Sequence, residues 1–269
     1  MPRPITFLSD FGVADEFAGV CRAVIARIAP EARIIDISHG VERHAISHGA
    51  AMLVNALPFA PAGVHMAVVD PGVGTERRAL AVAVAQEDRI LVGPDNGLLW
   101  PAIERFGGAV QAVDVTTSPV RLEPTSATFH GRDIFAPVTA HLASGMSLAQ
   151  VGEPLDPAEL VTLVTPAAVV DDGVLRTTVS YVDRYGNATL AADQGAADEA
   201  GLRAGAPLSV KTAGGNQRGV YAITFGEVAE GELLMYVAAS GRLALAINQG
   251  NAAERLGIAA GDEVVLGPC

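Results

Sequence analysis

Residues 5–144 alternate short apolar segments with longer segments of helical period, and this alternation limits the possible folds more than any other feature. In the longer segments, apolar residues recur every three or four positions, as on one face of a helix. Strands that alternate with helices at this spacing predict βαβ units, and so an α/β fold whose mostly parallel sheet is flanked by helices. The predicted strands are 5–8, 34–37, 64–69, 80–84, 89–92 and 110–113, and the predicted helices are 15–29, 46–57, 98–106 and 133–144.

Several of the predicted strands end in a cluster of polar residues, proline or glycine. These ends are Ser9-Asp10, Ser38-His39, Asp70-Pro71 and Pro94-Asp95-Asn96. In α/β sheets, ligands bind beyond the carboxyl ends of the strands, and parallel strands bring those ends to one edge. We therefore expect the four clusters to line a single crevice.

The composition changes near residue 150. Residues 152–166 are rich in Pro, Asp and Glu, and short apolar segments separated by glycine-bearing turns follow them. This pattern predicts a linker and then a smaller all-β, barrel-like or sandwich domain. We expect an α/β substrate-binding and catalytic domain over 1–153, a linker over 154–167 and an all-β domain over 168–269. The apolar segments are 175–182, 208–211, 220–225, 233–238, 243–247 and 263–266.

The charge balance excludes several kinds of partner. The 269 residues carry a net charge of −12 and a single lysine, Lys211. Nucleic acids and anionic membranes are bound by clustered Lys and Arg, so neither is expected as a partner. Two cysteines, Cys21 and Cys269, make neither a disulfide framework nor a four-cysteine zinc site. No apolar run approaches the ~18 residues of a membrane span and no signal region is evident, so we expect a cytoplasmic protein.

The familiar nucleotide and metal motifs are missing. There is no phosphate-binding Gly-x-x-x-x-Gly-Lys loop, and Gly72-Val-Gly74 is only a fragment of a dinucleotide motif. His44 and His48 have the i, i+4 spacing of zinc ligands, but Ala45 stands where a metalloprotease has its glutamate. We interpret the two histidines as a solvated or substrate-facing helix end, and we expect no metal and no cofactor.

Asp70 leaves a predicted strand directly into a Pro-Gly-Val-Gly turn, and Arg77 follows seven residues later. Proline fixes φ and glycine permits positive φ, so the loop should be sharp and rigid. A carboxylate and a guanidinium at this spacing could also form a salt bridge with a purely structural role. His130 stands beside Gly131 just before a predicted helix, where it could face a pocket or serve as a surface residue.

Two polar turns stand out in the second half. Asp183-Arg184-Tyr185-Gly186-Asn187 follows a strand and predicts a tight hairpin, and Asn248-Gln249-Gly250-Asn251 offers backbone amides and carbonyls. Ordinary β-turns use the same residues, so a structural interpretation of both turns stays open.

Six motifs taken together resemble one family, the S-adenosyl-L-methionine (SAM) hydroxide adenosyltransferases, which are relatives of fluorinating and chlorinating enzymes. The resemblance covers nearly the whole chain and implies an α/β domain, a β domain and a homotrimer. It further implies an active site between the first domain of one subunit and the second domain of its neighbour. The motifs are Ser9–Gly12 with Asp15, Asp36–His39, Val69–Gly74 with Arg77, Pro94–Gly97, Phe129–Asp133 and Asp183–Asn187.

The resemblance also implies the site residues. The catalytic trio falls on Asp70, Arg77 and His130. Asp10 would hold the ribose hydroxyls, and Asp183 the methionine amino group. The adenine would contact Asn187, Tyr185, Gln249 and Gly250, and the remaining substrate-binding positions would be Asp15, His44, Asn96, Phe129, Gly131 and Ser240. His44 falls where the halogenating relatives have a tryptophan beside the ribose.

Two departures from the halogenating relatives indicate the nucleophile. Those enzymes have a tyrosine where this chain has Asp70, and a halide-holding serine where it has Gly131. A carboxylate repels halide and accepts hydrogen bonds from water. The resemblance therefore implies hydrolysis of SAM, the substrate, to adenosine and L-methionine by in-line attack of an activated water on C5′. A halide-using adenosyltransferase, a non-catalytic SAM- or adenosine-binding protein and a metal-dependent hydrolase are the alternatives.

Overall fold

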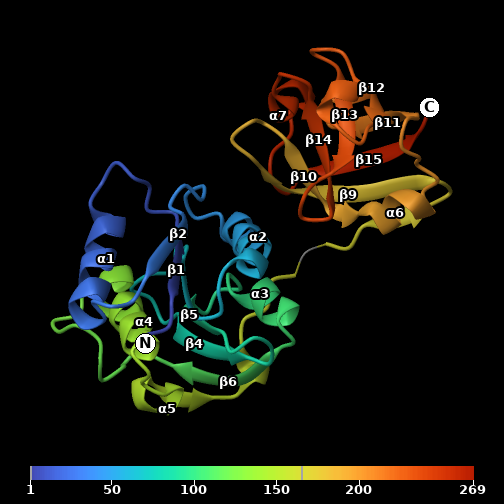
Figure 1. Ribbon diagram of the computed structural model, residues 1–269. Helices are drawn as coiled ribbons and strands as arrows, with labels where there is room; N and C mark the ends of the chain where they lie inside the picture. The colour runs from blue at the N-terminus through green and yellow to red at the C-terminus, as the bar shows by residue number, and fades with distance from the viewer. Residues whose placement is uncertain (1, 165) are drawn as a thin grey trace. The chain divides into compact units, whose positions relative to one another are not determined.

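The chain folds into two compact units, the first ending at Leu163 and the second starting at Val164. The structure is a computed structural model that describes residues 2–164 and 166–269, drawn in Figure 1. Each unit has its own apolar core of buried side chains.

A seven-stranded sheet forms the centre of the first unit. Its first four strands in space run parallel to one another, and antiparallel pairings add the last three. This arrangement confirms the α/β prediction. In spatial order the strands are β2 (Ile34–Ser38), β1 (Ile5–Ser9), β3 (Val64–Val68), β5 (Ile90–Pro94), β4 (Ala79–Val84), β6 (Ala109–Asp114) and β7 (Glu153–Leu155).

Helices cover both faces of this sheet because its strands are apolar on both faces. Ile5 and Phe7 of β1 pack into the cluster that contains α1 and α4, whereas Leu8 packs into the cluster that contains α2 and α3. Figure 1 shows α1 and α4 together on one side of the sheet. The helices of this unit are α1 (Phe17–Ile28), α2 (Ile46–Ala56), the 3₁₀ turn η1 (Leu57–Phe59), α3 (Trp100–Arg105), the π-helical turn η2 (Gly131–Phe135), α4 (Ala136–Ala143), α5 (Leu148–Val151) and the 3₁₀ turn η3 (Pro157–Glu159).

The strand order changes direction at β1. From β1 the chain passes through α1 to β2 on one side, and then through α2 to β3 on the other side. The carboxyl ends of β1 and β3 therefore flank the topological switch point, where α/β sheets open a crevice for ligands. Asp10 directly follows β1, and Asp70 follows β3 by two residues.

Much of the segment predicted to be a linker packs on the first unit. β7 pairs with β6, Leu160 is 5% exposed, and the Val161 N–H donates to Asp95 Oδ1 over 2.9 Å. Its prolines and acidic residues are typical of a linker. Pairing with the edge strand β6 and the hydrogen bond to the buried Asp95 carboxylate nevertheless attach it to the sheet. Thr165, also within the predicted linker, lies outside the described residues.

The second unit is a closed seven-stranded barrel, completed where β10 pairs with β9. The sequence predicts a barrel or a sandwich, and closure decides for the barrel. In spatial order the strands are β10 (Ala188–Asp193), β14 (Arg242–Ile247), β13 (Leu233–Val237), β12 (Gly215–Tyr221), β11 (Pro207–Thr212), β15 (Glu263–Pro268), β9 (Val174–Val182) and the flanking strand β8 (Val169–Asp171). The helical segments are α6 (Gln194–Glu199), the 3₁₀ turn η4 (Phe225–Glu227) and α7 (Ala252–Leu256).

Among the described residues, no helix is both long and apolar enough to cross a membrane.

Candidate active site

Asp70 and Arg77 are the two ends of a compact loop that follows β3. Inside the loop, the Val73 N–H donates to the Asp70 carbonyl over 3.3 Å, and the Thr75 hydroxyl donates to the Gly72 carbonyl over 2.7 Å. Gly74 takes a positive φ of 77°. This tight turn brings the arginine back beside the carboxylate.

The two side chains form a buried bidentate ion pair. Arg77 Nε donates to Asp70 Oδ1 over 3.0 Å, and Arg77 Nη2 donates to Asp70 Oδ2. Only 7% of the Arg77 side chain and 5% of the Asp70 side chain are exposed. The Arg77 guanidinium also lies 5.5 Å from the centre of the Phe135 ring. Bidentate geometry of this kind fixes both groups and is among the stronger ion-pair arrangements.

His130 completes a cluster of three. Arg77 Nη2 lies 3.1 Å from His130 Nδ1. Because a guanidinium carries only donors, Nδ1 must accept this bond, so the neutral ring carries its proton on Nε2. Burial and the Arg77 charge lower the pKa of His130 below its usual 6.5. The imidazole is therefore neutral near pH 7 and offers an Nε2–H donor.

Asp70 is a stronger base than a surface carboxylate. Burial raises its pKa above 3.8, and the opposing effect of Arg77 only partly offsets this. The structure thus contains the ion pair that the structural interpretation requires, but the pair also contacts an imidazole. Perturbed titratable groups gathered at the ligand edge of a sheet mark a candidate active site.

A second loop packs against the first and delivers His130. A Cβ added to Gly74 would lie 2.3 Å from the Ala127 carbonyl oxygen, so the two backbones approach as closely as glycine allows. The Ser126 N–H donates to Asp133 Oδ2 over 2.8 Å, which ties this loop to η2 just after His130. Single π-helical turns are frequent at functional sites.

Asp10 lies on the neighbouring strand end. Its N–H donates to the Val68 carbonyl over 3.3 Å, and its carboxylate accepts the His44 N–H over 3.0 Å. His44 has a positive φ of 64°, a strained conformation for a residue other than glycine. Asp10 therefore lies at the same strand edge as the ion pair, while the His44 side chain is exposed.

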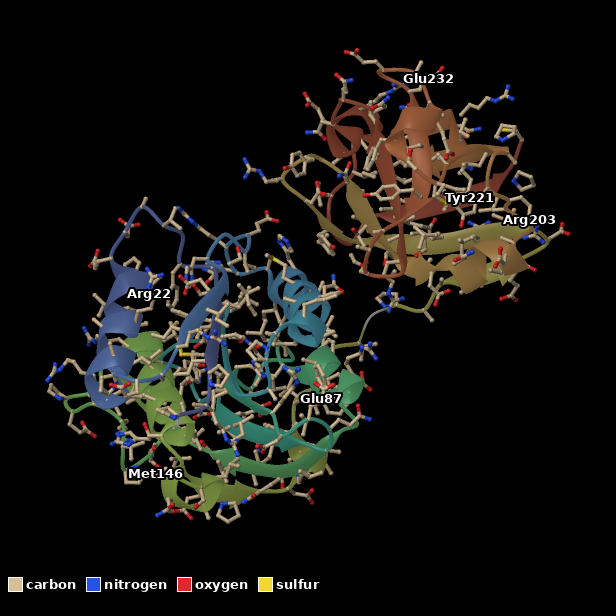
Figure 2. All side chains as sticks on the ribbon, viewed as in Figure 1. Arg22, Glu87, Met146, Arg203, Tyr221 and Glu232 are labelled. Atoms are coloured by element: carbon tan, nitrogen blue, oxygen red, sulfur yellow. The ribbon has the colours of Figure 1, made fainter. Side chains whose placement is uncertain are left out.

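The Ser9–Gly12 turn is held by the loop after β2. Ser9 Oγ lies 2.7 Å from His39 Nδ1, and the Gly12 N–H donates to the His39 carbonyl over 2.7 Å. His39 Nε2 is 3.2 Å from Asp36 Oδ1, and Asp36 in turn pairs with Arg22 of α1, which Figure 2 labels. Both predicted strand ends thus belong to one connected network.

Two rings of a three-phenylalanine cluster border Gly131, namely Phe11 and Phe129. Phe11, Phe17 and Phe129 contact one another edge to face, with ring centres 5.3–6.2 Å apart. A Cβ added to Gly131 would lie 2.8 Å from Phe11 Cζ. Any side chain at position 131 would therefore have to displace Phe11.

Two other predicted positions in the first unit have different surroundings. Asp15 is exposed on the loop between β1 and α1. The Asn96 amide donates to the Val69 carbonyl over 2.9 Å and accepts the Leu98 N–H over 3.1 Å, so it is engaged by the protein itself. Within residues 2–164 and 166–269, no three His, Cys, Asp or Glu residues are grouped as metal ligands.

In the second unit, the Asp183–Asn187 turn is self-contained. Asp183 Oδ1 accepts the N–H groups of Tyr185 and Asn187 over 2.8 and 3.0 Å, and Asp183 Oδ2 accepts from the Asn187 side chain over 2.8 Å. The turn presents Tyr185 to solvent, with 70% of that residue exposed. The predicted contact of Asp183 with substrate would have to use its remaining lone pairs.

The two polar turns of this unit lie side by side. A Cβ added to Gly186 would collide with Asn251 Oδ1 at 2.0 Å, and the Gly186 carbonyl accepts the Ala253 N–H over 2.9 Å. Gln249 has a positive φ of 57°, and both Gln249 and Gly250 are exposed. Ser240 is exposed on the β13–β14 connection.

The sequence prediction of the site did not include an aromatic pair that lies near Asp183. Phe225, 40% exposed, lies 4.9 Å from the Tyr236 ring centre to centre. Burial and the Asp183 charge raise the pKa of Tyr236, so its hydroxyl lies near that turn. Phe225 ends the predicted apolar segment 220–225, and nothing in that local pattern indicates its contact with Tyr236.

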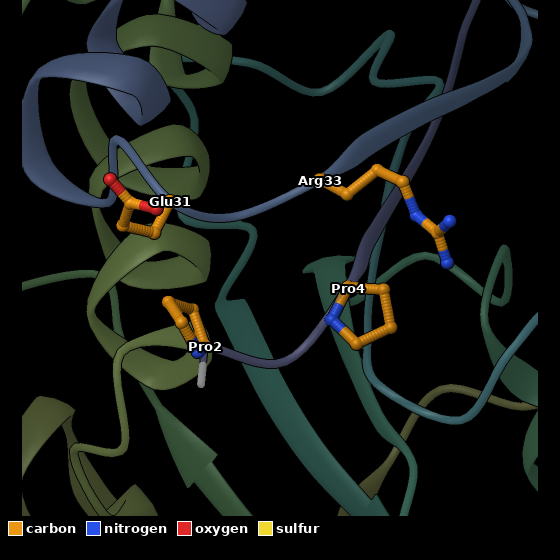
Figure 3. Close-up of a pocket in the computed structure, with 4 residues that line it drawn as sticks. All are labelled: Pro2, Pro4, Glu31 and Arg33. Atoms are coloured by element: carbon orange, nitrogen blue, oxygen red, sulfur yellow. The ribbon is translucent and has the colours of Figure 1, made fainter.

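A shallow hollow lies at the opposite edge of the first sheet. Figure 3 shows it between Pro2, Pro4, Glu31 and Arg33, which precede β1 and β2. It lies at the amino ends of these strands, away from the cluster just described.

The fold and the site define a class: an α/β unit followed by a β-barrel, with a buried carboxylate–guanidinium pair and a partly buried imidazole at the carboxyl edge of the sheet. The chain belongs to the SAM hydroxide adenosyltransferase family. The family's N-terminal domain matches residues 5–152, and its C-terminal domain matches residues 177–265.

Two hydrolases match this chain over nearly its full length, and a fluorinase matches about two thirds of it. The (R)-S-adenosyl-L-methionine hydrolase of Salinispora tropica is 45% identical over 98% of this chain and 97% of the relative. The enzyme of the same name from Thermus thermophilus is 38% identical over 98% and 99%. A fluorinase of an Actinoplanes species is 29% identical over 68% and 69%. Among solved structures, an uncharacterized conserved protein from Thermotoga maritima has a TM-score of 0.90 at 35% identity, covering 98% of this chain and 99% of that one.

The contact between the two site loops predicts a specific cost for Gly74→Ala. The new methyl group meets the Ala127 carbonyl in a left-handed conformation, so unfolding free energy should fall by at least ~1–2 kcal/mol. Gly72→Ala in the same loop is the matched control, because its Cβ finds only ordinary contacts of 3.5 Å or more. It should stay within ~1 kcal/mol of the unsubstituted protein in urea unfolding. Equal stability of the two variants would contradict the close approach.

Proposed function

We propose that this protein hydrolyses S-adenosyl-L-methionine to adenosine and L-methionine by attack of an activated water on C5′. The observation that carries the proposal is the buried Asp70–Arg77 pair in contact with the partly buried His130, beside Asp10 at the switch point, in a chain of this family. The names of the relatives that match over nearly their full length support the same reaction.

The leaving group of this reaction needs no catalytic help from the protein. The sulfonium of SAM departs as a neutral thioether, so no general acid is needed there. The site must hold an oxygen nucleophile in line with C5′ and exclude bulk water. Positioning of this kind contributes up to ~7–11 kcal/mol. Because attack on a sulfonium by an oxygen that loses its proton cancels charge, a dry site favours the transition state.

The three side chains then take distinct roles. Asp70, with its raised pKa, accepts a proton from the water. His130, whose Nδ1 accepts from Arg77, donates its Nε2–H to the water oxygen and orients it. Arg77 holds both partners in register, with four of its five N–H groups bonded to Asp70, His130 and the Arg78 carbonyl. The negative charge of Asp70 also disfavours a halide in place of water.

Substrate contacts come from both units in this proposal. Asp10 binds the ribose hydroxyls at the strand edge, and Phe129 and Gly131 border the reacting carbon. The turn of Asp183, Tyr185 and Asn187 and the turn of Gln249 and Gly250 contact the adenine and the methionine amino group. The exposure of Tyr185, Gln249 and Gly250 supports their availability to a ligand.

The sulfonium is a stereocentre, and the named relatives are hydrolases of the (R) epimer. We propose the same preference here. An enzyme that positions C5′, water and the departing sulfur in one line, while holding the adenosine and the methionine amino group, can favour one configuration at sulfur.

The direct test is incubation of the purified protein with each sulfonium epimer of SAM in ¹⁸O water. We expect adenosine and methionine by mass spectrometry, with the label in the adenosine 5′-hydroxyl and faster turnover of the (R) epimer.

Asp70→Asn keeps the shape of the side chain but loses the base, so turnover should fall by ~10²–10⁴-fold or more while substrate affinity stays within severalfold. Excess chelator or added chloride should change neither rate nor product. Label in methionine, or full activity of Asp70→Asn, would refute the mechanism.

The acid side of the pH profile follows from the two shifted groups. Asp70 must be ionised, with a pKa raised above 3.8, and His130 must be neutral, with a pKa below 6.5. Both requirements fail as pH falls, so kcat/KM should be level above about pH 7 and decline below 6.5. Circular dichroism at each pH checks the fold, since burial lowers the pKa of His65 to about 3 and protonation of the unfolded chain then reduces stability below pH 6.5. An acid limb centred above pH 7 would contradict these roles.

We further propose that the protein is a homotrimer in which the second unit of one subunit completes the adenine side of a neighbour's site. The family resemblance supports this assembly. The two sets of proposed ligand residues also lie in separate units of the chain. Light scattering should give three times the 27.6 kDa chain mass, and specific activity should fall on dilution below the assembly constant. A monomer of undiminished activity would overturn this assembly.

A further inference from the structure

The turn after β5 contacts the peptide that carries Asp70. Asn96 Nδ2 donates over 2.9 Å to the carbonyl of Val69, the residue immediately before Asp70. Asn96 Oδ1 accepts the Leu98 N–H over 3.1 Å, which closes an Asx turn. Both polar atoms of this side chain are therefore bonded within the protein, and one of the bonds fixes the approach of Asp70.

The preceding residue of the same turn acts on the arginine side. The Asp95 N–H donates to the Arg78 carbonyl over 2.9 Å. The same carbonyl accepts from Arg77 Nη1 over 3.1 Å. Asp95 Oδ2 also accepts from Arg78 Nε over 2.9 Å, and only 3% of the Asp95 side chain is exposed. Arg78 is thus held from both its backbone and its side chain, and its carbonyl holds the guanidinium of Arg77.

We propose that Asp95 and Asn96 are positioning residues that fix the Asp70–Arg77 pair from behind, Asn96 through the Val69 carbonyl and Asp95 through the Arg78 carbonyl. This inference rests on the proposed function, and it gives Asn96 a different role from the substrate contact that the resemblance implies. β5 is the strand next to β3, so its turn lies beside the loop that carries the pair.

Rigid support of the Asp70–Arg77 pair should affect the catalytic rate more than the substrate affinity. A displacement of ~1 Å in a catalytic group costs on the order of 10²-fold in rate, whereas substrate affinity depends on other contacts. The His130 ring offers a second readout. Its pKa is lowered by burial and by Arg77, and raised by Asp70 and Asp133. Displacement of the Asp70–Arg77 pair, whose Arg77 Nη2 lies 3.1 Å from Nδ1, should therefore shift that pKa.

Asn96→Ser is the most direct variant. Its hydroxyl can still cap the Leu98 N–H, as serine does in such turns, but it is too short to reach the Val69 carbonyl. Asn96→Asp is the second variant, since it keeps the shape and the cap while losing the donor. Glu159→Gln is the matched control, because Glu159 pairs with Arg78 from the exposed side with 62% of its side chain exposed.

The experiment measures kcat, KM, thermal unfolding and the NMR titration of His130 in the full-length protein. For both Asn96 variants we expect kcat to fall ~10–100-fold with KM within severalfold, and the NMR titration of His130 to shift in Asn96→Ser, because both members of the displaced pair act on the pKa of His130. On an Asp70→Asn background, Asn96→Ser should lower the residual rate no further, because it acts through Asp70. Glu159→Gln should behave as the unsubstituted protein.

Other outcomes overturn the inference. A raised KM with unchanged kcat would make Asn96 a substrate contact, and a loss of kcat that only follows the unfolded fraction would make it a structural residue. An unchanged His130 titration in a folded Asn96→Ser protein would also refute it. If the unsubstituted protein does not turn over SAM, the proposed function fails, and the His130 titration still decides whether Asn96 positions the pair.

Discussion

The buried ion pair between Asp70 and Arg77 is the interaction on which the carboxyl edge of the first sheet depends. Two charges removed from water are costly unless their remaining hydrogen-bonding groups are satisfied. The surrounding loops meet this requirement: His130 accepts from one guanidinium nitrogen, the Arg78 carbonyl accepts from another, and Phe135 lies against the group. The loops after β3 and β5, and the loop before η2, are therefore arranged around one pair of side chains.

The topology explains why this pair can face a ligand. β1 is the strand at which the order reverses, so no crossover helix closes the space beyond the ends of β1 and β3. Asp10 and Asp70 come from those two ends, and their loops are joined by the bond from the Asp10 N–H to the Val68 carbonyl. The carboxylates of Asp10 and Asp70 are thereby held at the ends of neighbouring strands of one sheet.

The strands of the second unit close into a barrel through β9 and β10. Tyr185, Gln249 and Gly250, which lie on its polar turns, are exposed. Asp183 uses three hydrogen bonds to shape its own turn, and Gly186 packs against Asn251 without room for a Cβ. These contacts fix the shape of both turns within the second unit itself.

The sequence was sufficient to predict the alternation of strands and helices, the polar strand ends and the order of the motifs, because hydrophobic period and turn chemistry are local properties. It did not reveal the alanine-rich strand β10, since alanine has little strand preference, nor the packing of residues 153–163 on the first unit. The folded arrangement of the loops was needed to show that Arg77 bonds to both Asp70 and His130, that Nε2 of His130 carries the proton, and that the Asn96 side chain is bonded to the Val69 carbonyl. These are contacts between residues 7 to 53 positions apart, and their geometry depends on how strands pair and loops pack rather than on any local pattern.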